Sequence, residues 1–297
     1  NLRIKCKYNF FIKPKMIRVY SLIFILLWSS AFITTKPIVD NSDPFAALAF
    51  RFFFVAVGFY LFSLFSKNSI IIKKNNLVES ILSGVLFHGL YLGGVFYSIS
   101  IGMPTSIAAL IVTLQPILTN ALSGPILNEK VTTKQWIGVL LGFLGAALVL
   151  GLDIGTDIPL LGLIATIIAL ISITTSTIWQ KKLSNNLPLP VSNFYQAVGG
   201  CLFHILIIIF FAEPYINFTK TFVIAMGHQI FLVSFGAFTI LMFLIKKNSA
   251  SKTVSIFFLI PATSAFMAWL FLNESLSHLD LVGFLITTIG VYIATRD

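Results

Sequence analysis

Two ionisable side chains lie inside long apolar runs of the chain, where a charge is costly. Arg51 lies seven residues into the run 44–66, about 10 Å deep at 1.5 Å per residue, and His88 lies near the middle of the run 77–99. A guanidinium can bind a carboxylate or phosphate through two parallel hydrogen bonds, and an imidazole can carry a proton near neutral pH. The alternatives are structural. Arg51 can extend its charged end toward water or cap carbonyls, and His88 can join two helices through a hydrogen bond worth roughly 1 kcal/mol.

Aromatic residues accompany these two side chains. Tyr91 and Tyr97 follow His88 by three and nine residues, spacings that we interpret as one broad helix face. Trp28, Ser29 and Phe32 share the first apolar run. Ring faces of this kind suit a cationic or aromatic solute. The alternative is an interfacial belt of Trp and Tyr side chains.

Two prolines interrupt apolar runs at related places. Pro116 follows Thr113 and Gln115 in one run, and Pro261 interrupts a later one. A proline removes a backbone hydrogen bond and frees a carbonyl, which lipid tolerates only where protein or a water-filled cavity satisfies that carbonyl. Broken helices at matching positions favour a binding site, and we place Gln115 and Thr113 near it. A packing kink is the alternative.

A Leu-Asn-Glu sequence follows each of these interrupted runs, giving Asn128 with Glu129 and Asn273 with Glu274. The two acids are predicted to lie about a bilayer apart, so they cannot act as a pair. We expect this motif to fix a hairpin turn, with each Glu capping the helix that follows it. The sequence has no CxxC, HExxH, GxGxxG or P-loop motif. No metal and no cofactor are therefore expected.

The composition indicates what surrounds these residues. Of 297 residues, 57% are hydrophobic, 10% are charged and 30 are Phe, and the mean hydropathy is +0.96. Soluble domains carry about 25% charged residues. This balance excludes a soluble enzyme, a disordered chain and a disulfide scaffold. The net charge of +10 lies mostly between the apolar runs, so we interpret it as a topology signal and not as a nucleic-acid surface. The sequence predicts an integral membrane protein.

Ten apolar runs are long enough to cross a bilayer, which takes about 20 residues. They lie near 17–36, 44–66, 77–99, 104–125, 133–152, 158–180, 190–211, 220–245, 250–272 and 279–295. Seventeen Lys and Arg residues fall on the side of the N-terminus, and only Lys36 and Lys220 fall on the other. The positive-inside rule then places both termini in the cytoplasm.

The chain repeats itself at an offset of 145 residues. The segment that starts at Ser106 aligns without a gap on the one that starts at Ser251, and it pairs the two prolines and the two Leu-Asn-Glu motifs. Five spans per period is an odd number, so the second copy must cross the membrane upside down. We expect an all-α membrane protein of two inverted five-helix repeats, 16–152 and 153–297, around a central cavity. That architecture serves alternating access. Residues 1–15 are expected to be a mis-assigned start or a basic cytoplasmic tail.

Five segments carry a resemblance to a known family. They are WSSAFITTKP (28–37), FRF (50–52), FYSISIGMPTSIAALIVTLQP (96–116) and the two LNE…G…G hairpins. Together they resemble the EamA branch of the drug/metabolite transporter superfamily. The resemblance implies ten helices, two repeats, a cavity lined in part by the first span, and transport of small metabolites, often as export of amino acids or related compounds. An arginine at the place of Arg51 is frequent in that family whatever the substrate.

The expected function is secondary transport of a small organic metabolite across a bacterial inner membrane. No carboxylate lies deep in a span, which favours amino-acid-like or neutral solutes. An efflux permease for amphipathic or cationic drug-like compounds is the alternative, and a channel, a sensor or a membrane-embedded enzyme are remote ones. The expected partners are the solute and the bilayer, with no nucleic acid. A homodimer is expected to use the glycine-bearing helices, the first of which contains Gly138, Gly142 and Gly145.

Overall fold

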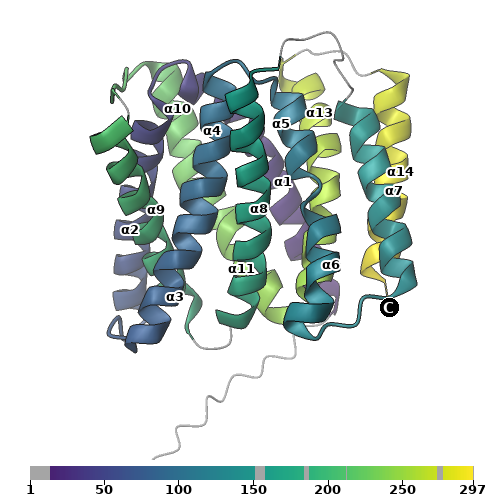
Figure 1. The fold of residues 1–297 in the computed structure, drawn as a ribbon, viewed down its shortest axis with the longest axis horizontal. Coiled ribbons are helices and arrows are strands. Elements are labelled where there is room, and N and C mark those ends of the chain that lie inside the picture. Colours follow the sequence, from purple (N-terminus) through teal and green to yellow (C-terminus); the bar gives the residue numbers. More distant parts are fainter. Residues whose placement is uncertain (1–13, 151–157, 184–186, 212, 273–276, 297) are drawn as a thin grey trace, which may run out of the picture.

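The computed structural model describes residues 14–150, 158–183, 187–211, 213–272 and 277–296, and helices account for nearly all of them (Figure 1). Seventeen helical elements follow one another: α1 Pro14–Val39, α2 Pro44–Phe65, α3 Lys74–Gly84, η1 Val85–Tyr91, α4 Leu92–Ser100, α5 Thr105–Val112, α6 Gln115–Leu127, α7 Thr133–Leu150, α8 Leu160–Leu183, α9 Leu189–Phe211, α10 Lys220–His228, η2 Gln229–Ala237, α11 Phe238–Lys247, α12 Ala250–Ser255, η3 Ile256–Phe258, α13 Leu259–Leu272 and α14 His278–Thr295. The segments η1 and η2 are π-helical, and η3 is a 3₁₀ turn.

These elements join into ten membrane-capable spans within the described residues, which confirms the ten predicted from hydropathy. The distribution of side chains reverses that of a soluble protein. Large apolar residues such as Phe53, Leu206 and Leu285 are exposed, whereas the amides of Gln180, Gln196 and others are buried. Lipid offers no hydrogen bonds, so polar groups gain most by turning inward to partners in the same chain. The helices therefore present an apolar surface to the bilayer, and the buried polar side chains lie among the apolar ones of a mixed interior.

The repeat of 145 residues is visible in the element bounds. The helices α2 and α9 begin at Pro44 and Leu189, and α7 and α14 span Thr133–Leu150 and His278–Thr295. The π-helical segments η1 and η2 also match at this offset. The fourth and ninth spans are interrupted at corresponding places, by the break between α5 and α6 and by η3. The expected breaks before Pro116 and near Pro261 are therefore present.

Matching helices of the two halves pack against each other in opposite directions. In the pair α7 and α14, which lies at the right of Figure 1, Gly138 lies against Ala294 while Gly145 lies against Thr287. In the pair α2 and α9, Tyr60 contacts Phe194, while the Ala49 carbonyl accepts a bond from Cys201. Antiparallel pairing of equivalent helices is what an inverted repeat requires.

The glycines of α7 are used inside the chain. A Cβ added at Gly138 would lie 2.4 Å from the Ala294 nitrogen, and one at Gly145 would lie 2.5 Å from the Thr287 nitrogen. This stripe lets two backbones touch, so the face is already covered by α14. A second copy would have to use other faces of these helices, where Leu140 and Leu285 are exposed.

We predict that Gly290→Ala destabilises the protein by about 1–3 kcal/mol, the usual cost of overpacking. Its new Cβ would lie 2.4 Å from the Gly142 nitrogen, and a backbone cannot yield as a side chain can. Gly227→Ala is the matched control, because nothing lies within 4 Å of its Cβ position. Thermal unfolding in detergent compares the two variants. Equal melting temperatures would contradict the packing described here.

Candidate functional site: a central cavity open at one face

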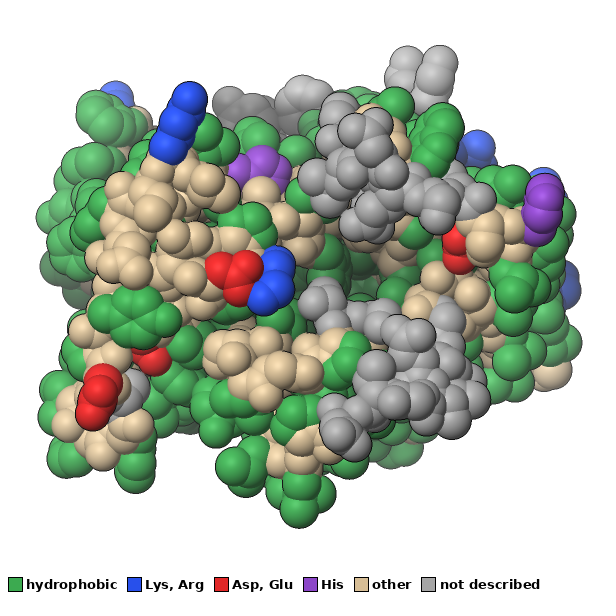
Figure 2. Space-filling view, turned by 90° about the horizontal axis from the view of Figure 1, so that it is seen from above, with side chains coloured by type: hydrophobic (Ala, Val, Ile, Leu, Met, Phe, Trp, Pro, Cys, Tyr) green, Lys and Arg blue, Asp and Glu red, His purple; other side chains and the backbone are tan. Residues whose placement is uncertain are grey.

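A cavity of about 530 Å³ lies between the halves of the bundle. It extends from the C-terminal ends of α1 and α7, at Lys36 and Leu150, down to the middle of the bundle at Trp28 and Tyr91. We call the surface at its mouth the Lys36 face, which is the upper surface in Figure 1. Figure 2 views this face from above and shows it hollowed near the middle. The cavity is lined by Trp28, Phe32, Ile33, Lys36, Pro37, Tyr91, Ala109, Val112, Thr113, Val149, Leu150, Phe257, Ile260, Pro261, Ser264 and Ala265.

The cavity wall is mostly apolar and aromatic. Its two aliphatic hydroxyl groups bond to backbone carbonyls: Thr113 donates to Ala109 at 2.6 Å, and Ser264 donates to Ser29 at 3.0 Å. The only charged side chain among the described lining residues is Lys36. Such a wall suits an apolar or neutral solute body, and its described residues include no acid that would retain a cation.

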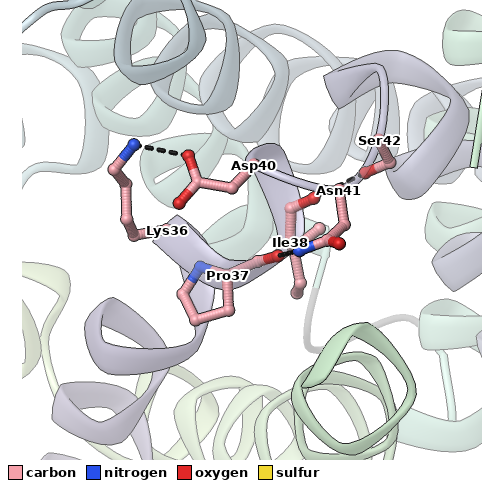
Figure 3. A network of polar contacts seen from close by, with 6 residues as sticks. All are labelled: Lys36, Pro37, Ile38, Asp40, Asn41 and Ser42. Carbon is pink, nitrogen blue, oxygen red and sulfur yellow. Dashed lines mark hydrogen bonds and ion pairs between the residues drawn. The ribbon is translucent and has the colours of Figure 1, made fainter. Parts of the chain in front are cut away.

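The mouth is shaped by the turn between α1 and α2. Lys36 Nζ lies 2.5 Å from the Asp40 carboxylate, Asn41 donates to the Pro37 carbonyl at 2.9 Å, and Ser42 donates to the Ile38 carbonyl at 2.7 Å (Figure 3). The Lys36 and Asp40 side chains are 64% and 49% exposed. Exposed ion pairs contribute about 0–1 kcal/mol, so this pair can exchange partners at little cost. Lys36 is thus available for other contacts at the mouth.

A smaller chamber of about 40 Å³ lies beside the cavity, and Trp28, Phe32 and Tyr91 line both. The chamber wall is mostly apolar, but it also includes the polar side chains of Arg51, His88, Gln229 and Ser234. Arg51 is only 4% exposed, and its Nε donates to Ser234 Oγ at 2.9 Å. No carboxylate of the described residues lies within 4.0 Å of it, since Lys36 and Asp40 form the one ion pair found there.

The two π-helical segments supply the groups around Arg51. His88 belongs to η1, and Gln229 and Ser234 belong to η2. A π-helical stretch often marks a functional site. The His88 ring lies between the rings of Phe52 and Phe238, at centroid distances of 4.4 and 4.5 Å, and its backbone carbonyl contacts His204 Nε2 at 2.9 Å. This imidazole is held firmly and borders the chamber.

The opposite end of the cavity is closed at what we call the Glu129 face, the lower surface in Figure 1. The Glu129 carboxylate accepts from the backbone nitrogens of Ala250 and Ser251 at 2.9 and 3.3 Å, at the start of α12. Lys181 donates to the carbonyls of Ile245 and Asn248 at 2.9 and 2.5 Å. An anion at a helix N-terminus and a cation at a helix C-terminus are both favourable. The Glu129 contacts join the two halves of the chain, whereas the Lys181 contacts join α8 to the end of α11 within the second half.

The expectation that Glu129 caps the helix that follows it was wrong, because its carboxylate caps the start of α12 instead. That role in α7 belongs to Thr132 and Gln135, because the Thr132 nitrogen donates to Gln135 Oε1 at 2.8 Å and the Gln135 nitrogen donates to Thr132 Oγ1 at 3.2 Å. Asn128 does end α6, in a left-handed conformation with φ of 56°. Asn273 and Glu274 lie outside the described residues.

Comparison with known proteins settles the family. The model of the EamA-like transporter family matches residues 16–151 and again residues 160–296. The chain belongs to the EamA-like transporter family. One solved crystal structure shares the fold with a TM-score of 0.80 at 18% identity, over 95% of this chain and 96% of that one.

Relatives of this EamA-like transporter are themselves named as transporters. The "Uncharacterized transporter YvbV" of Bacillus subtilis strain 168 is 27% identical over 72% of this chain and 69% of the relative. Two proteins called "Probable amino-acid metabolite efflux pump" also match. The one from Salmonella typhimurium strain LT2 is 22% identical over 92% of each chain, and the one from Escherichia coli strain K12 is 23% identical over 93% of each. A multi-pass membrane transporter follows from the family and the ten spans.

The structure places the predicted site residues of this EamA-like transporter in two groups. Those that border a space are Trp28, Phe32, Tyr91, Thr113 and Pro261 at the main cavity, and Arg51 and His88 at the chamber. Their contact with a solute remains a prediction.

The other group packs between helices. Ser29 donates to the Ile260 carbonyl at 3.2 Å, Gln115 donates to Thr177 Oγ1 at 3.0 Å beside the buried Pro116, and Tyr97 stacks on Phe45 at 5.9 Å. Tyr97 and His88 both pack against α2, on Phe45 and Phe52, but Tyr97 is not among the residues that line either space, and its contact with a solute stays a prediction. Sequence reasoning also missed Gln229, Ser234 and Phe257 as lining residues.

We predict that Glu129→Gln loosens the closed end. An amide keeps part of the hydrogen bonding but loses the charge that favours a helix N-terminus, a loss of about 1–1.4 kcal/mol, or five- to tenfold in opening. A reporter thiol introduced by Ser255→Cys, in a background without Cys6 and Cys201, should react correspondingly faster with a membrane-impermeant maleimide added from the Glu129 face.

Glu79→Gln is the control, because Glu79 lies in α3 on the same side of the bundle, away from α12. Unchanged labelling in Glu129→Gln, or equal acceleration in both variants, would show that the Glu129 cap does not hold this end closed.

Proposed function

We propose that the protein is a secondary carrier that exports amino-acid-like or neutral small metabolites across a bacterial inner membrane by alternating access. The observation that carries this proposal is a cavity of about 530 Å³ that is open at the Lys36 face and closed by interhelical contacts at the Glu129 face. Sites for small molecules usually measure about 300–1,000 Å³. A cavity with one open end is what a carrier needs in one of its two states.

Two further observations support the substrate class. The described residues that line the cavity include no Asp or Glu, so an amphipathic cation would meet no counter-charge there. Two relatives are named as probable amino-acid metabolite efflux pumps.

A second candidate, efflux of amphipathic cations, is favoured by the ring faces of Trp28, Phe32, Tyr91 and Phe257, since such faces attract cations. The nearby positive charges of Lys36 and Arg51 oppose it. We therefore rank metabolite export first.

Counterflow in proteoliposomes tests the proposal. Vesicles preloaded with one unlabelled compound from a panel of amino acids, nucleobases, sugars, polyamines and organic cations should transiently concentrate the labelled form of a single class above the level of protein-free vesicles. We expect that class to be neutral or zwitterionic. Accumulation confined to organic cations would favour the second candidate. Absence of counterflow for every compound, with folded protein, would refute a reversible carrier of these solutes.

Alternating access also predicts what the open end does when it closes. At the offset of 145 residues Lys36 corresponds to Lys181, and the Lys181 acceptors Ile245 and Asn248 correspond to Ser100 and Met103. If each half adopts the shape of the other, Lys36 leaves Asp40 and donates to the Ser100 and Met103 carbonyls.

Cross-linking examines this exchange. In a background without Cys6 and Cys201, the pair Lys36→Cys and Met103→Cys should form a disulfide that stops transport, and a saturating solute that favours closure of the Lys36 face should speed its formation. The control pair, Lys36→Cys with Lys220→Cys, uses the other basic residue of that face. A lack of bridging between positions 36 and 103 during turnover would contradict the exchange.

A further inference from the structure

The chamber beside the main cavity contains a buried cation that the described chain does not neutralise. Arg51 is 4% exposed and lies in the second span, and the Lys36–Asp40 pair, at the mouth, is the one ion pair of the described residues. Removing a charge from water costs several kcal/mol unless a partner compensates it. A ring contact with Phe52 at 5.3 Å and one hydrogen bond to Ser234 are the compensation that the chain provides. The described residues thus supply Arg51 with no counter-charge.

The geometry leaves donors of Arg51 ready for an anion. Its Nε is engaged by Ser234, whereas its two terminal nitrogens make no hydrogen bond with the described residues. Neither nitrogen is among the enclosed polar atoms that lack a partner, so each still borders some open space. The chamber is the space that Arg51 lines. The terminal nitrogens of a guanidinium match the two oxygens of a carboxylate.

The residues opposite Arg51 add no competing charge. Gln229 is 1% exposed, and its Nε2 donates to the Ala31 carbonyl at 3.0 Å and to Thr34 Oγ1 at 2.9 Å, which fixes the amide against α1. His88 is 4% exposed and is held between aromatic rings. Among the described residues that line the chamber, Arg51 thus carries the one permanent charge, and it is positive.

The size of the chamber limits what it can accept. Its volume of about 40 Å³ is a few times the roughly 10–15 Å³ that one water needs by the same kind of measure. That is room for a carboxylate group and not for a whole metabolite. Trp28, Phe32 and Tyr91 line both spaces, so a solute anchored in the chamber would keep its body in the large apolar cavity.

We propose that the chamber at Arg51 is the subsite for the carboxylate of the transported solute. The substrate class is then a monocarboxylate with an apolar body, and an ammonium group is not required, because the described lining of both spaces holds no acid to bind one. The claim that the bound solute is transported rests on the proposed function, whereas the binding of a carboxylate at Arg51 does not depend on transport.

Three solutes with the same body separate the contributions. They are L-leucine, L-leucinamide, which lacks the carboxylate, and 4-methylpentanoate, which lacks the amine. Binding to the purified full chain is followed by tryptophan fluorescence, since Trp28 borders both spaces, and by thermal stability. We expect leucine and 4-methylpentanoate to bind at least tenfold more tightly than leucinamide. Equal affinity for all three would overturn the proposal without any variant.

Substitution of Arg51 is the second part of this binding experiment. Arg51→Gln should remove the preference for the two carboxylates and leave leucinamide within twofold, and Arg51→Lys should retain part of it. Arg18→Gln is the matched control, because Arg18 is an exposed residue of α1. A uniform loss for all three solutes in Arg51→Gln, with Arg51→Lys no better, would mean a structural role and would overturn the proposal.

Titration of chloride into a buffer free of carboxylates distinguishes a solute carboxylate from an inorganic anion. Stabilisation by chloride that depends on Arg51, without any preference among the three solutes, would identify an inorganic anion site and overturn the substrate assignment. Counterflow separates this proposal from the proposed function. A carrier that transports leucinamide as well as leucine refutes the subsite alone, whereas specific carboxylate binding without counterflow refutes the carrier alone.

Discussion

The absence of water in the bilayer is the constraint on which the rest of the structure depends. Every polar group in a span needs a partner from the chain itself, and so hydroxyls and amides gather between the helices. Ser83 and Ser176, for example, face each other at 3.2 Å across two helices, and Gln180 donates to Gln196 at 2.9 Å. The interior that results mixes polar and apolar side chains, while the outer faces of the same helices carry exposed Phe, Leu and Ile. A site for a solute is then a local enlargement of an interior that lipid already forces the chain to build.

The same constraint explains where the helices are irregular. A break or a π-helical turn leaves carbonyls or side chains in unusual directions, and lipid permits this only beside other protein or a cavity. The π-helical segments η1 and η2 bring His88, Gln229 and Ser234 to the chamber, and the break of the ninth span lies at the cavity through Phe257 and Pro261. Straight helices such as α7 and α14 instead pack backbone on backbone through their glycines. Regular helices pack closely against each other, and irregular segments contribute residues to the candidate site.

This division also decides what could be predicted from the sequence. The ten spans follow from composition alone, because apolar length is what lipid requires of a helix. The position of Trp28, Phe32, Tyr91 and Arg51 beside a space followed from residue type and from the resemblance. The direction in which a side chain points could not be predicted from the sequence, because each span is apolar over most of its surface and carries little helical periodicity. Ser29 and Gln115 therefore turned out to bond neighbouring helices. The partner of Glu129 lies 121 residues away, and no local pattern contains that information.

The contacts at the two ends of the cavity are of unequal strength. This agrees with a cavity that is closed at the Glu129 face and open at the Lys36 face. At the Glu129 face an acid bonds two backbone nitrogens and Lys181 bonds two carbonyls, whereas at the mouth Lys36 is engaged with an exposed acid one turn away. A carrier must nevertheless keep its two states within a few kcal/mol of each other, or the minor one would not be populated. Two unrelated sets of contacts would meet that condition only by chance. Two repeats of similar sequence would meet it by construction under the proposed alternating access, because closure of the Lys36 face would form at one end the bonds that Lys181 loses at the other. On this proposal, the repeat of 145 residues balances the free energies of the two states as well as setting the architecture.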